Sequence, residues 1–149
     1  MIRGKVTYMP PEQLCDRDID GRADVFALGV TLYEVLAGAL PFQATNDERM
    51  MDAIIKDPAI PLPLVRLDCP AELWAIVQRA LAKDRAARFP DCRVFQRELE
   101  RFLVSRREIA TAHDVAQFVF QLFPEGDASL SLPLENRATE QRAASRPPE

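Results

Sequence analysis

Histidine and cysteine are scarce in this 149-residue sequence, and their scarcity excludes several kinds of site. The single histidine, His113, cannot form a histidine-rich metal centre, which needs several imidazoles. Cys15, Cys69 and Cys92 show no C-x-x-C spacing, so we expect reduced thiols in a cytoplasmic protein and no disulfide framework.

Long apolar runs are also missing. The longest apolar region, residues 24–42, is interrupted by Glu34 and bounded by Asp24 and Pro41, so no uncharged run reaches the about 18 residues of a membrane span. The first residues lack the apolar core of a secretory signal. A net charge of -4 gives no basic footprint for nucleic acid or for an anionic membrane. The composition therefore predicts a soluble globular protein without nucleic-acid or membrane partners.

Apolar side chains at helical spacing predict a mainly α-helical fold without strands. A short helix should begin at Pro11, because proline suits the first helical position and Pro10 keeps the residue before it extended. Residues 22–38 are apolar on almost every side and end at Gly38, so they should form the central helix of the domain. Further helices are expected at 45–57, 70–83, 91–103 and 111–123.

Local signals predict how these helices begin and end. Thr45 is expected to cap one helix in a capping box with Glu48, and Pro70 to occupy the first position of the next. Four prolines in residues 57–70 predict an irregular connection. In the helix that Asp91 should cap, the spacing of apolar residues places Leu103 toward the core, together with Phe95, Leu99 and Phe102.

The helix at 111–123 should be capped by Thr111 and Asp114, and it has a strongly apolar face that includes Phe118. We expect this face to pack on the preceding helices, with binding to a second protein as the alternative. Residues 124–149 lack periodicity and large apolar side chains, which predicts a disordered tail.

Three stretches carry a family resemblance: "GKVTYMPPEQL" at 4–14, "DGRADVFALGVTLYEVLAGALPF" at 20–42, and "LAKDRAARF" at 81–89. In order and spacing they resemble the second half of a protein kinase domain, most of all that of bacterial serine/threonine kinases. The resemblance covers about residues 4–104. It implies a partial kinase domain, the C-terminal lobe, at 1–104, an additional helix at 105–123 and the tail at 124–149.

By this resemblance the first stretch is the end of an activation segment, which shapes the pocket for the protein substrate. The residues assigned to that segment and pocket are Gly4, Lys5, Tyr8, Met9 and Pro11. Lys5 stands where the family usually has threonine, and Pro10 where alanine is usual. The lysine leaves the choice of substrate open.

The resemblance also implies two structural roles for charged residues. Glu12 should form a buried ion pair with Arg88, although each residue taken alone would be a solvated surface charge. Asp24 should accept hydrogen bonds from the catalytic loop and hold that loop in place. The alternative for Asp24 is an acid that stabilises the N-terminal end of a helix.

The parts that perform phosphoryl transfer are not in the sequence. It contains no G-x-G-x-x-G loop, no H-R-D and no D-F-G, all of which precede the activation-segment end in a kinase. We therefore expect no catalytic, cofactor-binding or metal-binding residue in this chain. ATP and Mg²⁺ are implied only for the longer proteins of the family.

The expected function is a fragment of a serine/threonine kinase, a signalling transferase that moves the ATP γ-phosphate to protein serine or threonine. Alone, the chain should be inactive, and its partners should be the kinase N-terminal half and a protein substrate or regulator. The alternative is a non-catalytic, pseudokinase-like docking module. A piece of a longer kinase, a decaying gene and a functional truncated module all remain open.

Overall fold

The computed structural model describes residues 6–107 and 111–122, and within them it contains helices and no strand. This confirms the mainly α fold that the periodicity predicts. The elements in chain order are η1 (Val6–Tyr8), α1 (Pro11–Leu14), α2 (Arg22–Ala37), α3 (Asp47–Lys56), α4 (Leu62–Val65), α5 (Ala71–Ala80), η2 (Arg85–Ala87), α6 (Cys92–Ser105) and α7 (Ala112–Leu122).

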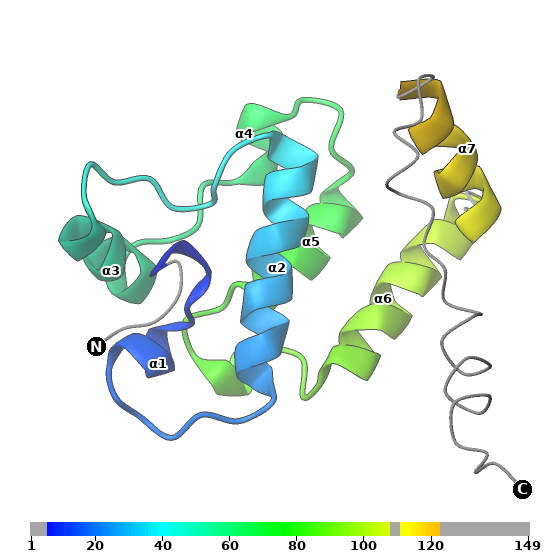
Figure 1. The fold of residues 1–149 in the computed structure, drawn as a ribbon. Helices are drawn as coiled ribbons and strands as arrows, with labels where there is room; N and C mark the ends of the chain where they lie inside the picture. The colour runs from blue at the N-terminus through cyan, green and yellow to red at the C-terminus, as the bar shows by residue number, and fades with distance from the viewer. Residues whose placement is uncertain (1–5, 108–110, 123–149) are drawn as a thin grey trace, which may run out of the picture. The chain divides into compact units, whose positions relative to one another are not determined.

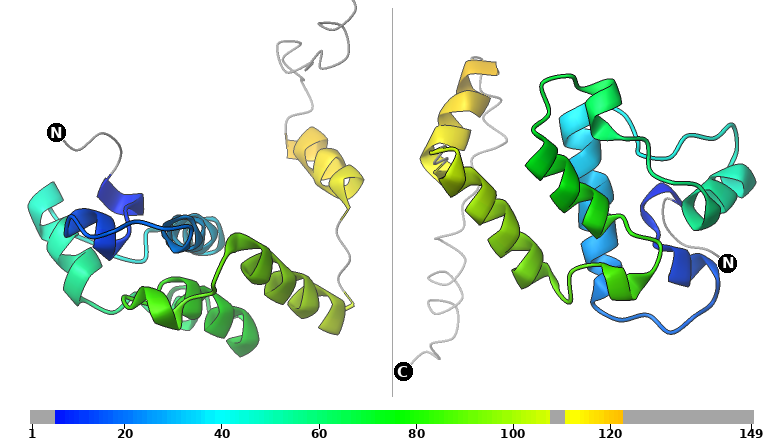
Figure 2. Two further views of the ribbon diagram at one scale, coloured as in Figure 1. Left: turned by 90° about the horizontal axis from the view of Figure 1, so that it is seen from below. Right: turned by 180° about the vertical axis from the view of Figure 1, so that it is seen from behind.

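The chain divides into two compact units, Met1–Glu108 and Ile109–Glu149. In the first unit α2 is central and contacts η1, α4, α5 and α6 (Figure 1). Viewed along α2, α5 covers one side of that helix, and η1 and α1 lie at another (Figure 2). The central position of α2 follows from its composition, because a helix with few polar residues must be covered on most of its surface.

Two adjoining clusters of buried side chains make up the core around α2. The larger one contains Phe26, Val30, Tyr33, Phe42, Met50, Ala53, Ile54, Leu62, Val77 and Leu81, and the smaller one contains Val25, Ala80, Phe89 and Phe95. Helices α2 and α5 approach very closely at Gly29, where an added Cβ would lie 2.9 Å from the Cβ of Ala80. The glycine is therefore required by packing.

Three helix ends lie where the local sequence signals predict them. Gly38 ends α2 in the left-handed conformation, with φ of 67°, and donates its N–H to the Glu34 carbonyl. Asp91 caps α6 by accepting from the Val94 N–H at 2.8 Å. In the second unit, Asp114 accepts from both the N–H and the hydroxyl of Thr111, the cap that the sequence predicts for α7.

Four predictions about helices need correction. Asn46, and not Thr45, caps α3, because its side chain accepts from the Arg49 N–H at 2.9 Å and asparagine is as good an N-cap as threonine. Pro70 is extended and precedes α5, which begins at Ala71. The proline-rich connection 57–70 contains one helical turn, α4. Leu103 is 37 % exposed, because the last turn of α6 extends beyond the core.

Helix α7 has an apolar face on which Val115, Phe118 and Val119 are exposed. Its packing on the first unit stays a prediction. The predicted tail at 124–149 lies outside the described residues, and so do Gly4 and Lys5. Among the residues that the structure does describe, no helix is both long enough and apolar enough to cross a lipid bilayer.

Candidate functional site

The segment 6–14 holds most of the described candidate residues. One turn of 3-10 helix, η1, leads to Pro10, which is extended with φ of -74° and ψ of 156°, and Pro11 then begins α1. Met9 and Pro11 are buried against the rest of the first unit. Pro10 and Pro11 each have a fixed φ angle, which restricts the conformation in which the segment enters the core.

Glu12 and Arg88 form a buried ion pair across 76 residues of sequence. The two Nη atoms of Arg88 donate to the two carboxylate oxygens at 2.7 and 2.8 Å, in a bidentate arrangement. Glu12 is 5 % exposed and Arg88 is 2 % exposed. The pair fastens α1 to the loop between η2 and α6.

The guanidinium of Arg88 has a partner for every donor. Besides the two bonds to Glu12, it donates to the carbonyls of Ala82 at 2.7 Å, Arg22 at 3.1 Å and Lys83 at 3.2 Å. These five bonds use the five N–H groups that an arginine side chain carries. Arg88 therefore joins α1, the N-terminal end of α2 and the loop after α5 at one point.

Electrostatics favour the ionised form of this pair. Burial alone would raise the pKa of the Glu12 carboxyl, but the hydrogen bonds and the charge of Arg88 outweigh that effect and hold the pKa below its ordinary value. Glu12 is therefore a carboxylate at neutral pH, and its charge is neutralised within the core.

Tyr8 connects the same segment to the central helix. Its hydroxyl donates to Oε2 of Glu34 on α2 at 2.6 Å, and this bond raises the pKa of the Tyr8 phenol. Sequence reasoning did not find this role of Glu34. The available signal was an isolated acid inside a long apolar helix.

Asp24 lies in the first turn of α2 and is exposed. Leu28, Thr31 and Val35 follow it at helical spacing, and all three are exposed, Leu28 to 47 % and Val35 to 76 %. These four residues define one exposed line along α2. The role of Asp24 in holding a catalytic loop stays a prediction.

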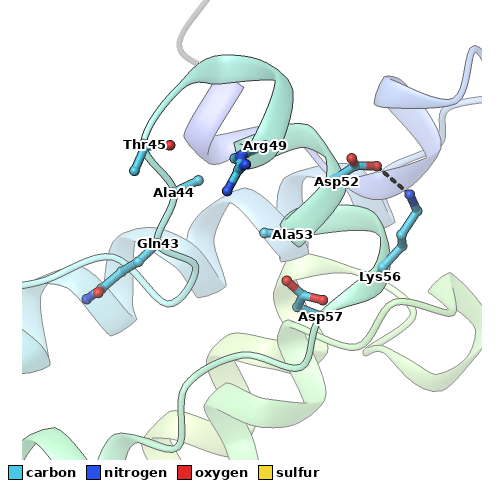
Figure 3. A pocket seen from close by; sticks show the side chains of 8 residues that line it. All are labelled: Gln43, Ala44, Thr45, Arg49, Asp52, Ala53, Lys56 and Asp57. Carbon is cyan, nitrogen blue, oxygen red and sulfur yellow. Dashed lines mark hydrogen bonds and ion pairs between the residues drawn. The ribbon is translucent and has the colours of Figure 1, made fainter.

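A groove of about 420 Å³ runs beside α3 (Figure 3). Its charged side chains come from one face of the helix and its end, and Lys56 and Asp52 pair across one turn at 2.5 Å. The lining consists of Gln43, Ala44, Thr45, Arg49, Asp52, Ala53, Lys56 and Asp57. Two positive side chains, Arg49 and Lys56, and two negative ones, Asp52 and Asp57, balance here, so the groove carries no net charge that would attract a small anion.

Two further observations concern groups that could bind a metal. Over residues 6–107 and 111–122, no group of three or more histidine, cysteine, aspartate or glutamate side chains is placed to hold a metal ion. His113, in the first turn of α7, is exposed.

Comparison with known proteins identifies relatives of one kind. Residues 2–99 match the family model described as protein tyrosine and serine/threonine kinase. The chain is 41 % identical over 103 residues to tyrosine-protein kinase MasK of Myxococcus xanthus (strain DK1622), which covers 69 % of this chain and 16 % of that protein. It is 38 % identical over 103 residues to serine/threonine-protein kinase Pkn1 of Myxococcus xanthus, covering 67 % of this chain and 14 % of that protein.

A eukaryotic relative extends further along the chain. Serine/threonine-protein kinase ULK3 of Mus musculus is 33 % identical over 144 residues, which covers 93 % of this chain and 29 % of that protein. The chain thus spans less than a third of the length of each of these relatives.

Proposed function

The chain belongs to the protein tyrosine and serine/threonine kinase family, and from this membership we propose that it is the substrate-facing C-terminal lobe of a longer cytoplasmic kinase. That kinase would transfer the ATP γ-phosphate to serine or threonine side chains of a signalling protein. The observation that carries the proposal is the bidentate Glu12–Arg88 pair. This pair anchors the segment 6–14, and it joins the same two residues that the family resemblance pairs.

Within this proposal the lobe supplies a rigid support for a protein substrate. Tyr8 is held by its hydrogen bond to Glu34 and Met9 by burial, and the family resemblance assigns Gly4 and Lys5 to the same substrate-facing segment. Since all five donors of Arg88 are bound, the segment 6–14 is already ordered before a substrate arrives. It therefore loses little conformational entropy when a substrate binds.

We assign ATP and Mg²⁺ to an upstream half that would precede this lobe. The sequence lacks the glycine-rich loop, the H-R-D and the D-F-G that hold the phosphates and the metal in this family. The 149 residues by themselves should then be inactive, and the exposed line along α2 with Asp24 would receive the catalytic loop of that half.

The direct test is a phosphotransfer assay. We expect the 149-residue chain, incubated with γ-labelled ATP, Mg²⁺ and a serine-, threonine- and tyrosine-rich protein, to transfer no more label than a blank. Transfer that depends on the chain and disappears when Glu12 or Arg88 is replaced would overturn the assignment of catalysis to an upstream half.

Reading the gene upstream of codon 1 in the same frame distinguishes the two candidate functions. An open frame that encodes a glycine-rich loop, a strand lysine, H-R-D and D-F-G supports the kinase lobe. A stop codon immediately upstream supports the second candidate, a non-catalytic module that recruits a substrate or regulatory protein. The groove beside α3 favours this second candidate, because it offers a contact surface.

A further inference from the structure

Lys83 caps the end of a helix that lies far from it in the sequence. Its Nζ atom donates to the carbonyl oxygens of Ala53 at 3.2 Å and Ile54 at 2.5 Å, about thirty residues away. Both carbonyls lie in the last turn of α3, where C=O groups run out of partners within the helix, and the Ala53 carbonyl also accepts from the Asp57 N–H at 2.9 Å. A positive ammonium is also stabilised at this end, because the helix dipole is negative at its C-terminus.

The same ammonium contacts an aromatic pair that reaches the central helix. Lys83 Nζ lies 3.8 Å from the ring centroid of Phe42, and the Phe42 ring is nearly parallel to that of Phe26, with centroids 6.2 Å apart. The guanidinium carbon of Arg88 lies 4.8 Å from the Phe26 centroid. Two cations from one loop thus bind one buried aromatic pair, an arrangement in which the ring faces attract each charge.

The backbone of Lys83 supplies a second connection to the ion pair. Nη2 of Arg88 donates to the Lys83 carbonyl at 3.2 Å and to Oε2 of Glu12 at 2.8 Å. One residue therefore contacts the last turn of α3 with its side chain and the Glu12–Arg88 pair with its backbone. A displacement of the last turn of α3 would therefore move Lys83 and change its contact with the Glu12–Arg88 pair, and a displacement of the pair would change the contact of Lys83 with α3.

The last turn of α3 also forms one wall of the groove beside that helix. Ala53, Lys56 and Asp57 line the groove (Figure 3). The Ala53 carbonyl is one of the two carbonyls that Lys83 binds. A protein that occupies the groove would contact the turn whose position Lys83 fixes.

We propose that Lys83 is a positioning residue that couples the groove beside α3 to the segment containing Glu12. Through its two carbonyl contacts and the Phe42–Phe26 pair, it makes the position of the last turn of α3 depend on the ion pair. A ligand that binds the groove only while the last turn of α3 holds this position would then also stabilise the segment 6–14. The coupling is a property of this unit alone, and it holds whether or not the proposed kinase function is correct.

The test is hydrogen exchange of the full 149-residue chain, read by mass spectrometry on peptides that cover 11–17 and 50–57. Lys83→Met keeps the apolar stem and removes the charge and the donors. We expect exchange to rise by more than about tenfold in 50–57, because two hydrogen bonds from a charged donor are lost and one alone accounts for about tenfold, and to rise measurably in 11–17. Lys83→Arg, which restores a cation and donors, should recover part of the protection in both peptides.

The control is Arg101→Met on α6. Arg101 is exposed, pairs with Glu98 on its own helix and lies outside α3 and the groove, so its loss should leave exchange in both peptides unchanged. If the emission of Trp74 shows that Lys83→Met is unfolded, Phe42→Leu replaces it as the test, because it removes the ring face and keeps an apolar side chain. Exchange that rises in 50–57 alone, or equally in the Arg101 variant, would overturn the coupling.

Discussion

Replacing Arg88 by methionine tests most directly how the segment 6–14 is held. The change removes the five hydrogen bonds of the guanidinium and leaves the Glu12 carboxylate buried without its counter-ion. Breaking a buried pair by removing one partner costs about 3–5 kcal/mol of the free energy of unfolding. Small domains are stable by about 5–15 kcal/mol, so the variant should be close to unfolding at room temperature.

Glu12→Gln is a milder version of the same perturbation. The amide keeps the volume of the carboxylate but loses its charge, while Arg88 keeps its three carbonyl acceptors. We expect a loss of about 1.5–3 kcal/mol, the range for a hydrogen bond to a charged group. As a control, Arg101→Met breaks the exposed pair with Glu98 on α6 and should cost less than about 0.5 kcal/mol.

Urea unfolding followed by the emission of Trp74 is a suitable assay. Trp74 is the single tryptophan, and it packs edge-on against Tyr33 with ring centroids 6.4 Å apart, so its emission reports on the first unit. A loss below about 1 kcal/mol in the Arg88 variant would mean that the pair is solvated, and the reasoning from burial would be wrong.

The pH dependence of the same pair has a definite sign. Since the pKa of Glu12 is lower in the folded than in the unfolded protein, its contribution is complete above the unfolded value of about 4.3. This contribution of Glu12 to the free energy of unfolding is lost as the pH falls from about 4.3 through the lower pKa of the folded protein, because the unfolded state binds the proton more tightly. The stability difference between wild type and Glu12→Gln should shrink over that window, and a constant difference would contradict the assignment.

Three further predictions concern packing, an unpaired hydroxyl and a buried lysine. Gly29→Ala should cost about 1–3 kcal/mol by urea unfolding, because the new methyl group meets the Ala80 Cβ, which cannot move aside. Tyr33→Phe should leave stability unchanged or raise it in the same assay, because the buried Tyr33 hydroxyl has no partner among the described residues. Burial lowers the pKa of Lys83 to about 8, so near neutral pH the cost of burying the ammonium offsets part of what its carbonyl and ring contacts contribute. That cost disappears as the pH rises from there to the unfolded value of about 10.4, so the stability difference between wild type and Lys83→Met should grow over this window.

Local sequence signals predict the elements of this fold well and the contacts between them poorly. Gly38 and Asp91 act within a few residues of themselves, so their roles as helix ends can be read from spacing. Asn46 was missed because Thr45 beside it is an equally plausible cap, and only the backbone geometry distinguishes the two.

The polar contacts of the candidate site depend on residues that are distant in sequence. Glu12 and Arg88 were matched by family resemblance and not by any local pattern, since 76 residues separate them. No pattern marks Lys83 as a cap for α3 or Glu34 as the acceptor for Tyr8, because each contact forms only when the chain has folded. Gly29 gives no signal either, because its role depends on how closely α5 approaches.

The exposed line along α2 refines what an apolar central helix implies. If the helix were apolar all round, any side of it that other elements leave uncovered would be a contiguous apolar surface, the kind that drives association. Along the observed line, however, the polar Asp24 and Thr31 alternate with Leu28 and Val35, and the Thr31 hydroxyl is occupied by the Ala27 carbonyl at 3.0 Å. Two separated apolar side chains are ordinary for a protein surface, so they provide little free energy for self-association. A partner that covers this line must therefore bring groups that pair with Asp24, which is what the family resemblance implies for a catalytic loop.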